Sequence, residues 1–165
     1  MDSPSLQLRL FGPLEITWGG AGRALHPGQA PELRTPGALP SAPSSTTAQS
    51  LLAYLIVHHN RPIARDKLTG MFWPERSDAR ARRALSHTLW QIRQALGAAA
   101  DRLVAERHTL SFTMAEGDWL DVEAFERQLE HPGGGRLQHG ESGHVSALES
   151  LTSCLELCRG DFLAG

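Results

Sequence analysis

Apolar residues near the N-terminus recur at every second position. The pattern runs over residues 6–18, begins with Leu6, Leu8 and Leu10, and is interrupted at Gly12-Pro13. A period of two is typical of strands with one buried face, and a Gly-Pro pair is typical of a turn. We therefore predict two strands of an N-terminal antiparallel sheet.

A segment without regular spacing follows at residues 19–45. It contains five glycines and five prolines. Both residue types interrupt helices and strands, so we predict a long flexible loop here.

Helical spacing begins at Thr46 and predicts two helices in succession. The first is expected to start with Thr46 or Thr47 as its cap and to end near residue 60. The second, over residues 64–72, is expected to end before Pro74, because the residue preceding a proline is disfavoured in a helix.

A third and longer helix is predicted between Asp78 as its cap and Gly97 as its terminator. One face is an apolar stripe formed by Leu85, Leu89, Ile92 and Leu96. The opposite and flanking positions carry basic, imidazole and amide side chains: Arg80, Arg82, Arg83, His87, Gln91, Arg93 and Gln94. Such a helix suits the DNA major groove, where Arg and Gln bind base edges, and a solvated surface helix is the alternative interpretation.

Alternation returns after the third helix. Leu103 and Ala105, followed by Leu110 and Phe112, predict a β-hairpin with a basic tip at residues 106–108. Three helices followed by a hairpin is the order of a winged helix-turn-helix domain, with the third helix as reader and the hairpin as wing. The predicted fold class is therefore α+β, with the N-terminal sheet, a three-helix core and this wing.

Three further side chains have two interpretations each. Trp90 is expected to pack against the hairpin rather than to stack on a base. Arg65 and Lys67, near the start of the second helix, either touch phosphate at the groove edge or lie on a solvated face.

The last third of the chain predicts one or two trailing helices. One begins at Asp121 and another covers residues 145–158, with a glycine-rich joint at residues 131–143 between them. We therefore divide the chain into a domain at residues 1–115 and the trailing helices at residues 116–165.

The net charge of −2 conceals an uneven distribution of charged residues. Residues 61–107 hold ten basic and five acidic side chains, whereas residues 108–165 hold three basic and ten acidic ones. The basic segment coincides with the predicted helix-turn-helix and wing. This asymmetry favours an electrostatic binding face over an evenly neutral surface.

Several classes of protein are disfavoured by what the sequence lacks. It has no apolar run long enough for a transmembrane helix and no signal-peptide pattern, so we expect a cytoplasmic protein without a membrane partner. It has no phosphate-binding glycine loop, His-Glu-x-x-His motif or nucleophile elbow, so we expect no enzyme. Cys154 and Cys158 lack a second ligand pair at zinc-site spacing, so we expect neither a metal nor a cofactor.

Five motifs in the first two thirds of the chain form a set: Leu8-Arg9-Leu10-Phe11-Gly12-Pro13-Leu14, Leu51-Leu52-Ala53-Tyr54-Leu55, Phe72-Trp73-Pro74, Ala81-Arg82-Arg83-Ala84-Leu85 and Leu89-Trp90-Gln91-Ile92-Arg93. In combination they resemble the SARP-type bacterial transcriptional activators. Asp121-Val122 and the segment at residues 159–165 resemble the entry into that family's helical-repeat activation domain, which residues 116–165 would begin.

The resemblance implies an OmpR-type winged helix that binds direct-repeat promoter DNA, usually as a pair of protomers, and recruits RNA polymerase. By position, His87, Thr88 and Gln91 match groove-facing places of the reading helix. Arg83 and Arg93 match phosphate-contacting places, and Arg107 lies at the wing tip. With Arg80 and Arg82 of the same helix, these residues form the predicted DNA-binding set.

A protein–protein interaction module of a larger signalling regulator, with little DNA affinity of its own, is the alternative function. Its contact surface would be the acidic C-terminal third. The two functions are compatible, because the basic and acidic poles occupy different segments.

Overall fold

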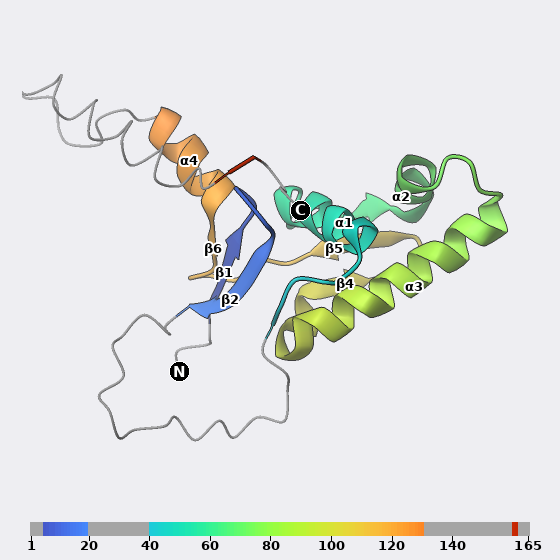
Figure 1. Cartoon of the computed structure of the whole chain (residues 1–165), viewed down its shortest axis with the longest axis horizontal. Helices are drawn as coiled ribbons and strands as arrows, with labels where there is room; N and C mark the ends of the chain where they lie inside the picture. Colours follow the sequence, from blue (N-terminus) through green and yellow to red (C-terminus); the bar gives the residue numbers. More distant parts are fainter. Residues whose placement is uncertain (1–4, 20–39, 131–159, 162–165) are drawn as a thin grey trace, which may run out of the picture.

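The computed structural model describes residues 5–19, 40–130 and 160–161 (Figure 1). Its helices are α1 (Thr46–Val57), α2 (Arg65–Phe72), α3 (Asp78–Leu96), the 3-10 helix η1 (Gly97–Arg102) and α4 (Asp121–Glu130). Its strands are β1 (Ser5–Arg9), β2 (Glu15–Gly19), β3 (Ile63–Ala64), β4 (Leu103–Ala105), β5 (Thr109–Phe112) and β6 (Trp119–Leu120). The mixed α+β class is as predicted. Most of the predicted loop, the glycine-rich joint and the helix at 145–158 lie outside the described residues.

The strands form two three-stranded sheets, ordered β2-β1-β6 and β3-β5-β4. β1 pairs with β2 in the antiparallel manner predicted, with Leu8 opposite Ile16. β6 was not predicted, and it pairs with β1 in parallel, so the first sheet is mixed and not wholly antiparallel. β3 was also not predicted, and it extends the hairpin by pairing Ile63 with Leu110.

One hydrophobic core joins both sheets and the first three helices. Figure 1 shows α1 between the first sheet and α3, which explains why Leu51, Leu52 and Leu55 are all fully buried. The predicted alternation in β1 directs Leu6, Leu8 and Leu10 into the same core. The stripe predicted for the third helix also lies inside it.

The helix starts differ slightly from those predicted. Ser45 and Ser77 occupy the cap positions of α1 and α3, and neither side chain forms a capping hydrogen bond. Thr46 and Asp78 are therefore the first helical residues and not caps. Gly97 ends α3 as predicted, with a φ of 52°.

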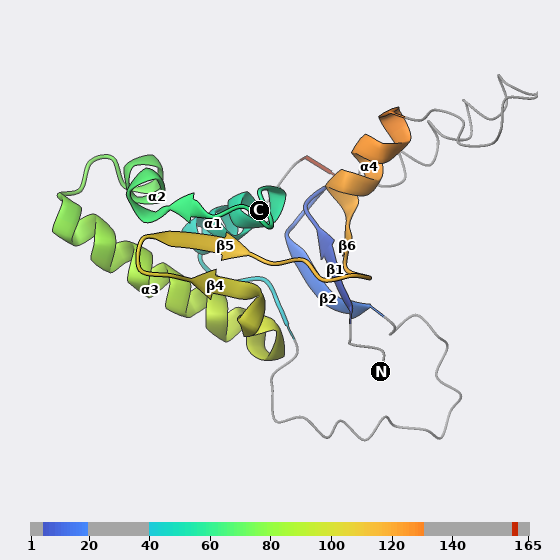
Figure 2. The ribbon, with the colours of Figure 1, turned by 180° about the vertical axis from the view of Figure 1, so that it is seen from behind.

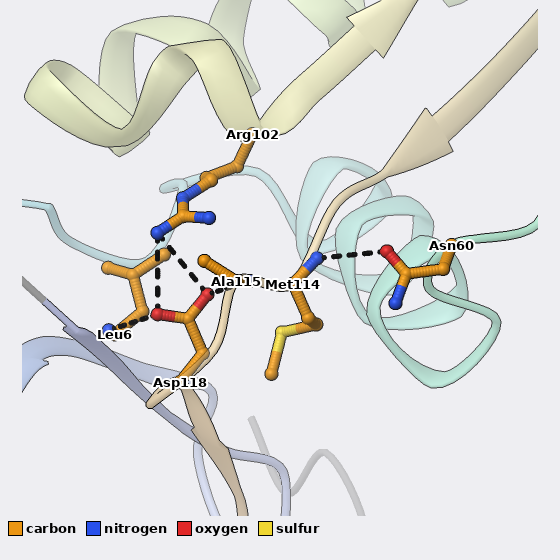
Figure 3. A network of polar contacts seen from close by, with 6 residues as sticks. All are labelled: Leu6, Asn60, Arg102, Met114, Ala115 and Asp118. Atoms are coloured by element: carbon orange, nitrogen blue, oxygen red, sulfur yellow. Dashed lines mark hydrogen bonds and ion pairs between the residues drawn. The ribbon is translucent and has the colours of Figure 1, made fainter. Parts of the chain in front are cut away.

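Two buried carboxylates, one just before β6 and one at the first residue of α4, bind the backbone of β1 and of the two residues after it. The carboxylate of Asp118 accepts hydrogen bonds from the backbone N–H groups of Leu6 and Ala115, each at 2.7 Å. It also lies 3.4 Å from the guanidinium of Arg102 (Figure 3). The carboxylate of Asp121 accepts from the N–H groups of Leu10 and Phe11, at 2.8 and 2.9 Å. The boundary predicted after residue 115 thus falls just before a segment that is bonded to the first strand.

Three further contacts among the described residues join α4 and residues 160–161 to the turn after β1 and to the segment after α1. Glu123 of α4 forms an ion pair with His59 at 3.2 Å, and the Phe125 ring meets Phe11 edge-on at 5.3 Å between centroids. The carbonyl of Asp161 accepts a 3.0 Å hydrogen bond from the backbone of Gly12. Leu129 of α4 is 51% exposed.

Candidate nucleic-acid interface

The interface is built on the pair α2 and α3, which pack together around a short turn. α2 ends at Phe72, because Pro74 disfavours the helical conformation at Trp73, the residue before it. The backbone N–H of Trp73 donates the last helical hydrogen bond, to the carbonyl of Thr69 at 3.0 Å. A further turn, closed by Arg76 donating to the carbonyl of Trp73, leads into α3. The sequence thus produces a helix, a tight turn and a second helix.

α3 is amphipathic, and its buried face fixes which side chains point outward. The buried residues are Ala81, Leu85, Thr88, Leu89, Ile92 and Leu96. They recur at three- and four-residue intervals, which places them along one side of the helix. The opposite side is consequently free to carry charged and polar groups.

Most of the predicted DNA-binding residues are exposed on α3, and Arg107 is exposed at the tip of the hairpin. The exposed members of the set are Arg80, Arg82, Arg83, His87, Arg93 and Arg107. Gln91 is half-buried at the edge of the same surface. The structure therefore brings seven of the eight predicted side chains to the solvent-facing side of α3 or to the hairpin tip.

Thr88 does not fit the groove-facing position assigned to it. Its side chain is buried, with 5% exposure, and its hydroxyl donates to the carbonyl of Ala84 at 2.9 Å. A hydroxyl bonded to its own helix backbone is a common way to satisfy a buried threonine. Thr88 thus belongs to the packed face of α3 and is not available to a base edge.

A hollow of about 780 Å³ lies along one flank of α3. It is lined by the start of α1, the turn after α2 and the polar flank of α3: Ser45, Thr47, Trp73, Arg76, Arg80, Arg83, Ala84, His87, Thr88 and Gln91. Arg76 was not among the predicted site residues. It lies outside the third helix, so helical periodicity gave no signal for it.

A second hollow, of about 490 Å³, lies on the other flank, between α3 and the hairpin tip. It contains Arg82 and Arg107 together with Arg65. The Nε of Arg65 donates to the carbonyl of Glu106 at 3.0 Å, so this arginine fastens α2 to the hairpin. Figure 2 shows the hairpin strands beside α3. Basic side chains thus line the space on both flanks of the helix.

The ion pairs on this surface leave its positive charge accessible. Arg82 lies 4.0 Å from Asp66, but the two side chains are 66% and 86% exposed. An ion pair so open to water contributes little to stability. Arg82 can therefore exchange Asp66 for another anion.

Trp90 does not pack against the hairpin as predicted. Its side chain is 58% exposed on α3, and its ring lies 6.0 Å from that of His87, tilted by 34°. The core positions beside it are filled by Leu89 and Ile92. The indole is thus part of the outward surface.

In residues 5–19, 40–130 and 160–161, no group of three or more His, Cys, Asp or Glu side chains is placed to hold a metal ion. In that same part of the chain, no helix combines the length and apolar character needed to cross a bilayer.

Comparison with solved structures shows a similar fold in a known protein. No protein-family model and no curated protein matches the chain. The structure of Mycobacterium tuberculosis EmbR in complex with a low-affinity phosphopeptide matches with a TM-score of 0.66 and 20% sequence identity. The chain shares a fold with part of EmbR. The match covers 98% of this chain, which spans 38% of the EmbR chain.

Proposed function

We propose that this chain is the sequence-specific, double-stranded DNA-binding part of a SARP-type transcriptional regulator. The observation that carries the proposal is the exposed face of α3, which bears arginine, histidine and amide side chains and no acidic residue after Asp78, and which is flanked by two hollows containing arginines. The likeness to EmbR, a regulator of the SARP type, supports the same class.

In the proposed mechanism, α3 is the reading helix of a winged helix-turn-helix domain and enters the major groove. His87 and Gln91 then face base edges, while Arg80, Arg83 and Arg93 contact phosphates on either side. Arg82 and Arg107 bind the backbone where the hairpin, acting as the wing, approaches the duplex. The acidic α4 lies away from α3, which favours an orientation with its outer surface directed toward protein (Figure 1).

The proposal extends to the role of the whole regulator. It acts as an activator in the cytoplasm, recruits RNA polymerase at direct-repeat promoter sites and pairs with a second protomer on DNA. It requires no catalytic activity of its own, because binding and recruitment suffice for activation.

The decisive experiment is a polarisation titration against duplexes selected from a random library, repeated between about 50 and 200 mM salt. If Arg80, Arg82, Arg83, Arg93 and Arg107 each neutralise one phosphate, log Kd should change with log salt with a slope of about 4 to 5, since each phosphate contributes about 0.9. Absence of binding by the folded protein at the lower salt concentration would refute the proposal.

A triple variant distinguishes DNA binding from the alternative function, a protein interaction module with little DNA affinity. Arg80, Arg82 and Arg83 changed together to alanine should abolish promoter occupancy if α3 binds DNA. If occupancy persists and polymerase recruitment alone is lost, the same surface binds protein instead.

A further inference from the structure

Trp90 lies at the centre of the outward face of α3. Successive helical residues are about 100° apart, so Trp90, seven positions after Arg83, lies only about 20° from it around the helix axis. Ile92, on the buried face with 0% exposure, lies roughly opposite Arg83 by the same spacing. The indole is therefore on the side of α3 that points directly away from the core.

The side chains on either flank are polar or basic. By the same spacing, Arg80 and Gln91 lie to one side of Trp90, and Arg82 and Arg93 lie to the other. When a helix occupies the major groove, the centre of its outward face meets the base edges most directly, and side chains beside it reach either bases or phosphates according to their length and chemistry. Trp90 occupies that central position, and most of its side-chain surface is apolar and suited to an apolar group on a base edge.

The exposed apolar surface of Trp90 would be stabilised by contact with an apolar group of a binding partner. More than half of the side chain is open to water, and His87 covers part of the ring at a centroid distance of 6.0 Å. Among the groups that base pairs present in the major groove, the C5-methyl of thymine is the apolar one. Contact between the indole and this methyl group removes apolar surface of both from water.

We propose that Trp90 is a specificity-determining residue that contacts the C5-methyl group of a thymine in the major groove. This inference rests on the proposed function, since it requires α3 to enter that groove. The ring of His87 lies beside the indole, with 6.0 Å between the centroids, so both side chains belong to the surface that approaches the base edges.

The test compares thymine with deoxyuridine, which differs by that one methyl group. The probe is the tightest duplex that the wild-type protein selects from a random library, followed by versions in which each thymine is replaced singly by deoxyuridine. For wild type, one replacement should weaken binding about fourfold, the effect of losing one buried methyl group. For Trp90→Ala, the same replacement should change the Kd by less than the measurement error, because the partner of the methyl group is gone.

A matched control is Leu129→Ala, which removes a similarly exposed apolar side chain from α4 (51% exposed). This variant should retain the wild-type loss on replacement by deoxyuridine. Equal melting temperatures of the three proteins establish that Trp90→Ala folds, as expected for an exposed position. Trp90→Phe, which keeps an aromatic ring, should retain part of the discrimination.

The outcomes separate this inference from the proposed function. Wild-type protein that binds its selected duplex but tolerates deoxyuridine at every position overturns the role of Trp90 and leaves DNA binding intact. If Trp90→Ala still binds the deoxyuridine duplex about fourfold more weakly than the thymine duplex, the proposed role of Trp90 is also wrong. Wild-type protein that selects and binds no duplex overturns the proposed function, and the inference with it.

Discussion

Gln91 and Arg93 are two residues apart in the sequence but lie on opposite flanks of α3. Gln91 is half-buried and lines the larger hollow, and its amide carries both a donor and an acceptor for a base edge. Arg93 is exposed and has a long, flexible side chain that can follow a phosphate. Their surroundings thus favour a base-reading role for the first and a charge-neutralising role for the second.

This difference gives a prediction for the two alanine variants. Gln91→Ala should relax sequence preference at one or two base pairs, whereas Arg93→Ala should weaken binding to all duplexes alike and lower the salt slope by about 1. Both effects are measured by titrating each variant against selected and scrambled duplexes. Arg127→Ala on α4 is the control, because it removes an arginine exposed far from α3 and should change neither quantity.

If Gln91→Ala and Arg93→Ala weakened every duplex to the same extent, the division into base and phosphate contacts would be wrong.

Residue-level expectations succeeded where the position around the helix decided the outcome. Leu85, Leu89 and Ile92 are buried as their spacing requires, and Arg83 is exposed opposite them. The prediction for Thr88 was wrong, because the sequence does not distinguish an exposed threonine from a buried one whose hydroxyl donates to its own helix backbone.

The prediction for Trp90 was wrong in the opposite sense, because a residue expected to be packed is exposed. Its apolar character suggested packing against the hairpin, although its position around α3 is on the outward face. Helical spacing was the better guide, and it was available from the sequence.

At the scale of elements, length determined what could be predicted. The 19 residues of α3 show a full apolar stripe, and the alternation of β1 and β2 extends over both strands. β3 and β6 contain two residues each, which is too short for any periodicity to be visible. Their existence depends on partner strands that are distant in sequence, and no local pattern encodes that.

The end of α3 offers a prediction at this scale. Gly97 has a φ of 52° and a ψ of −116°, a backbone conformation that residues with a Cβ atom rarely adopt. Gly97→Ala should therefore lower the free energy of unfolding by about 1–2 kcal/mol. Urea unfolding followed by circular dichroism measures this change.

Gly70 provides the matched control within α2. A Cβ atom added there would meet no other atom within 4 Å, and the residue is helical. Gly70→Ala should therefore raise the free energy of unfolding by about 0.5–1 kcal/mol, since alanine favours the helix. A loss of stability in Gly70→Ala, or none in Gly97→Ala, would contradict the role given to backbone conformation.

At the scale of the molecule, the first strand and the segment before α4 form one unit. Asp118 and Asp121 together accept the backbone N–H groups of Leu6, Leu10 and Phe11, and Leu120 is 2% exposed in the core. The sequence indicated a boundary after residue 115 because the hairpin ends there. It carried no local sign that the next strand returns to β1.

Truncation tests whether the contacts between β1 and the segment at residues 118–121 are needed for stability. A fragment of residues 1–115 loses β6 and both carboxylates, and each unsatisfied buried group costs about 1–3 kcal/mol. We expect its melting temperature to fall steeply or its cooperative transition to disappear, as followed by near-UV circular dichroism. A fragment of residues 1–130 keeps these contacts and should melt close to the full chain. Equal melting of the two fragments would show that β6 is dispensable.

The parallel pairing of β1 with β6 also determines the order of folding during synthesis. The hydrogen bond from Leu6 to Asp118 spans 112 positions of the chain. β2 can pair with β1 early, but the other edge of β1 remains open until the ribosome has released Asp118 and β6. At about 5–20 residues per second, this takes many seconds, during which an open strand edge is available to other chains. The nascent protein is therefore exposed to edge-to-edge aggregation until its last described strand emerges.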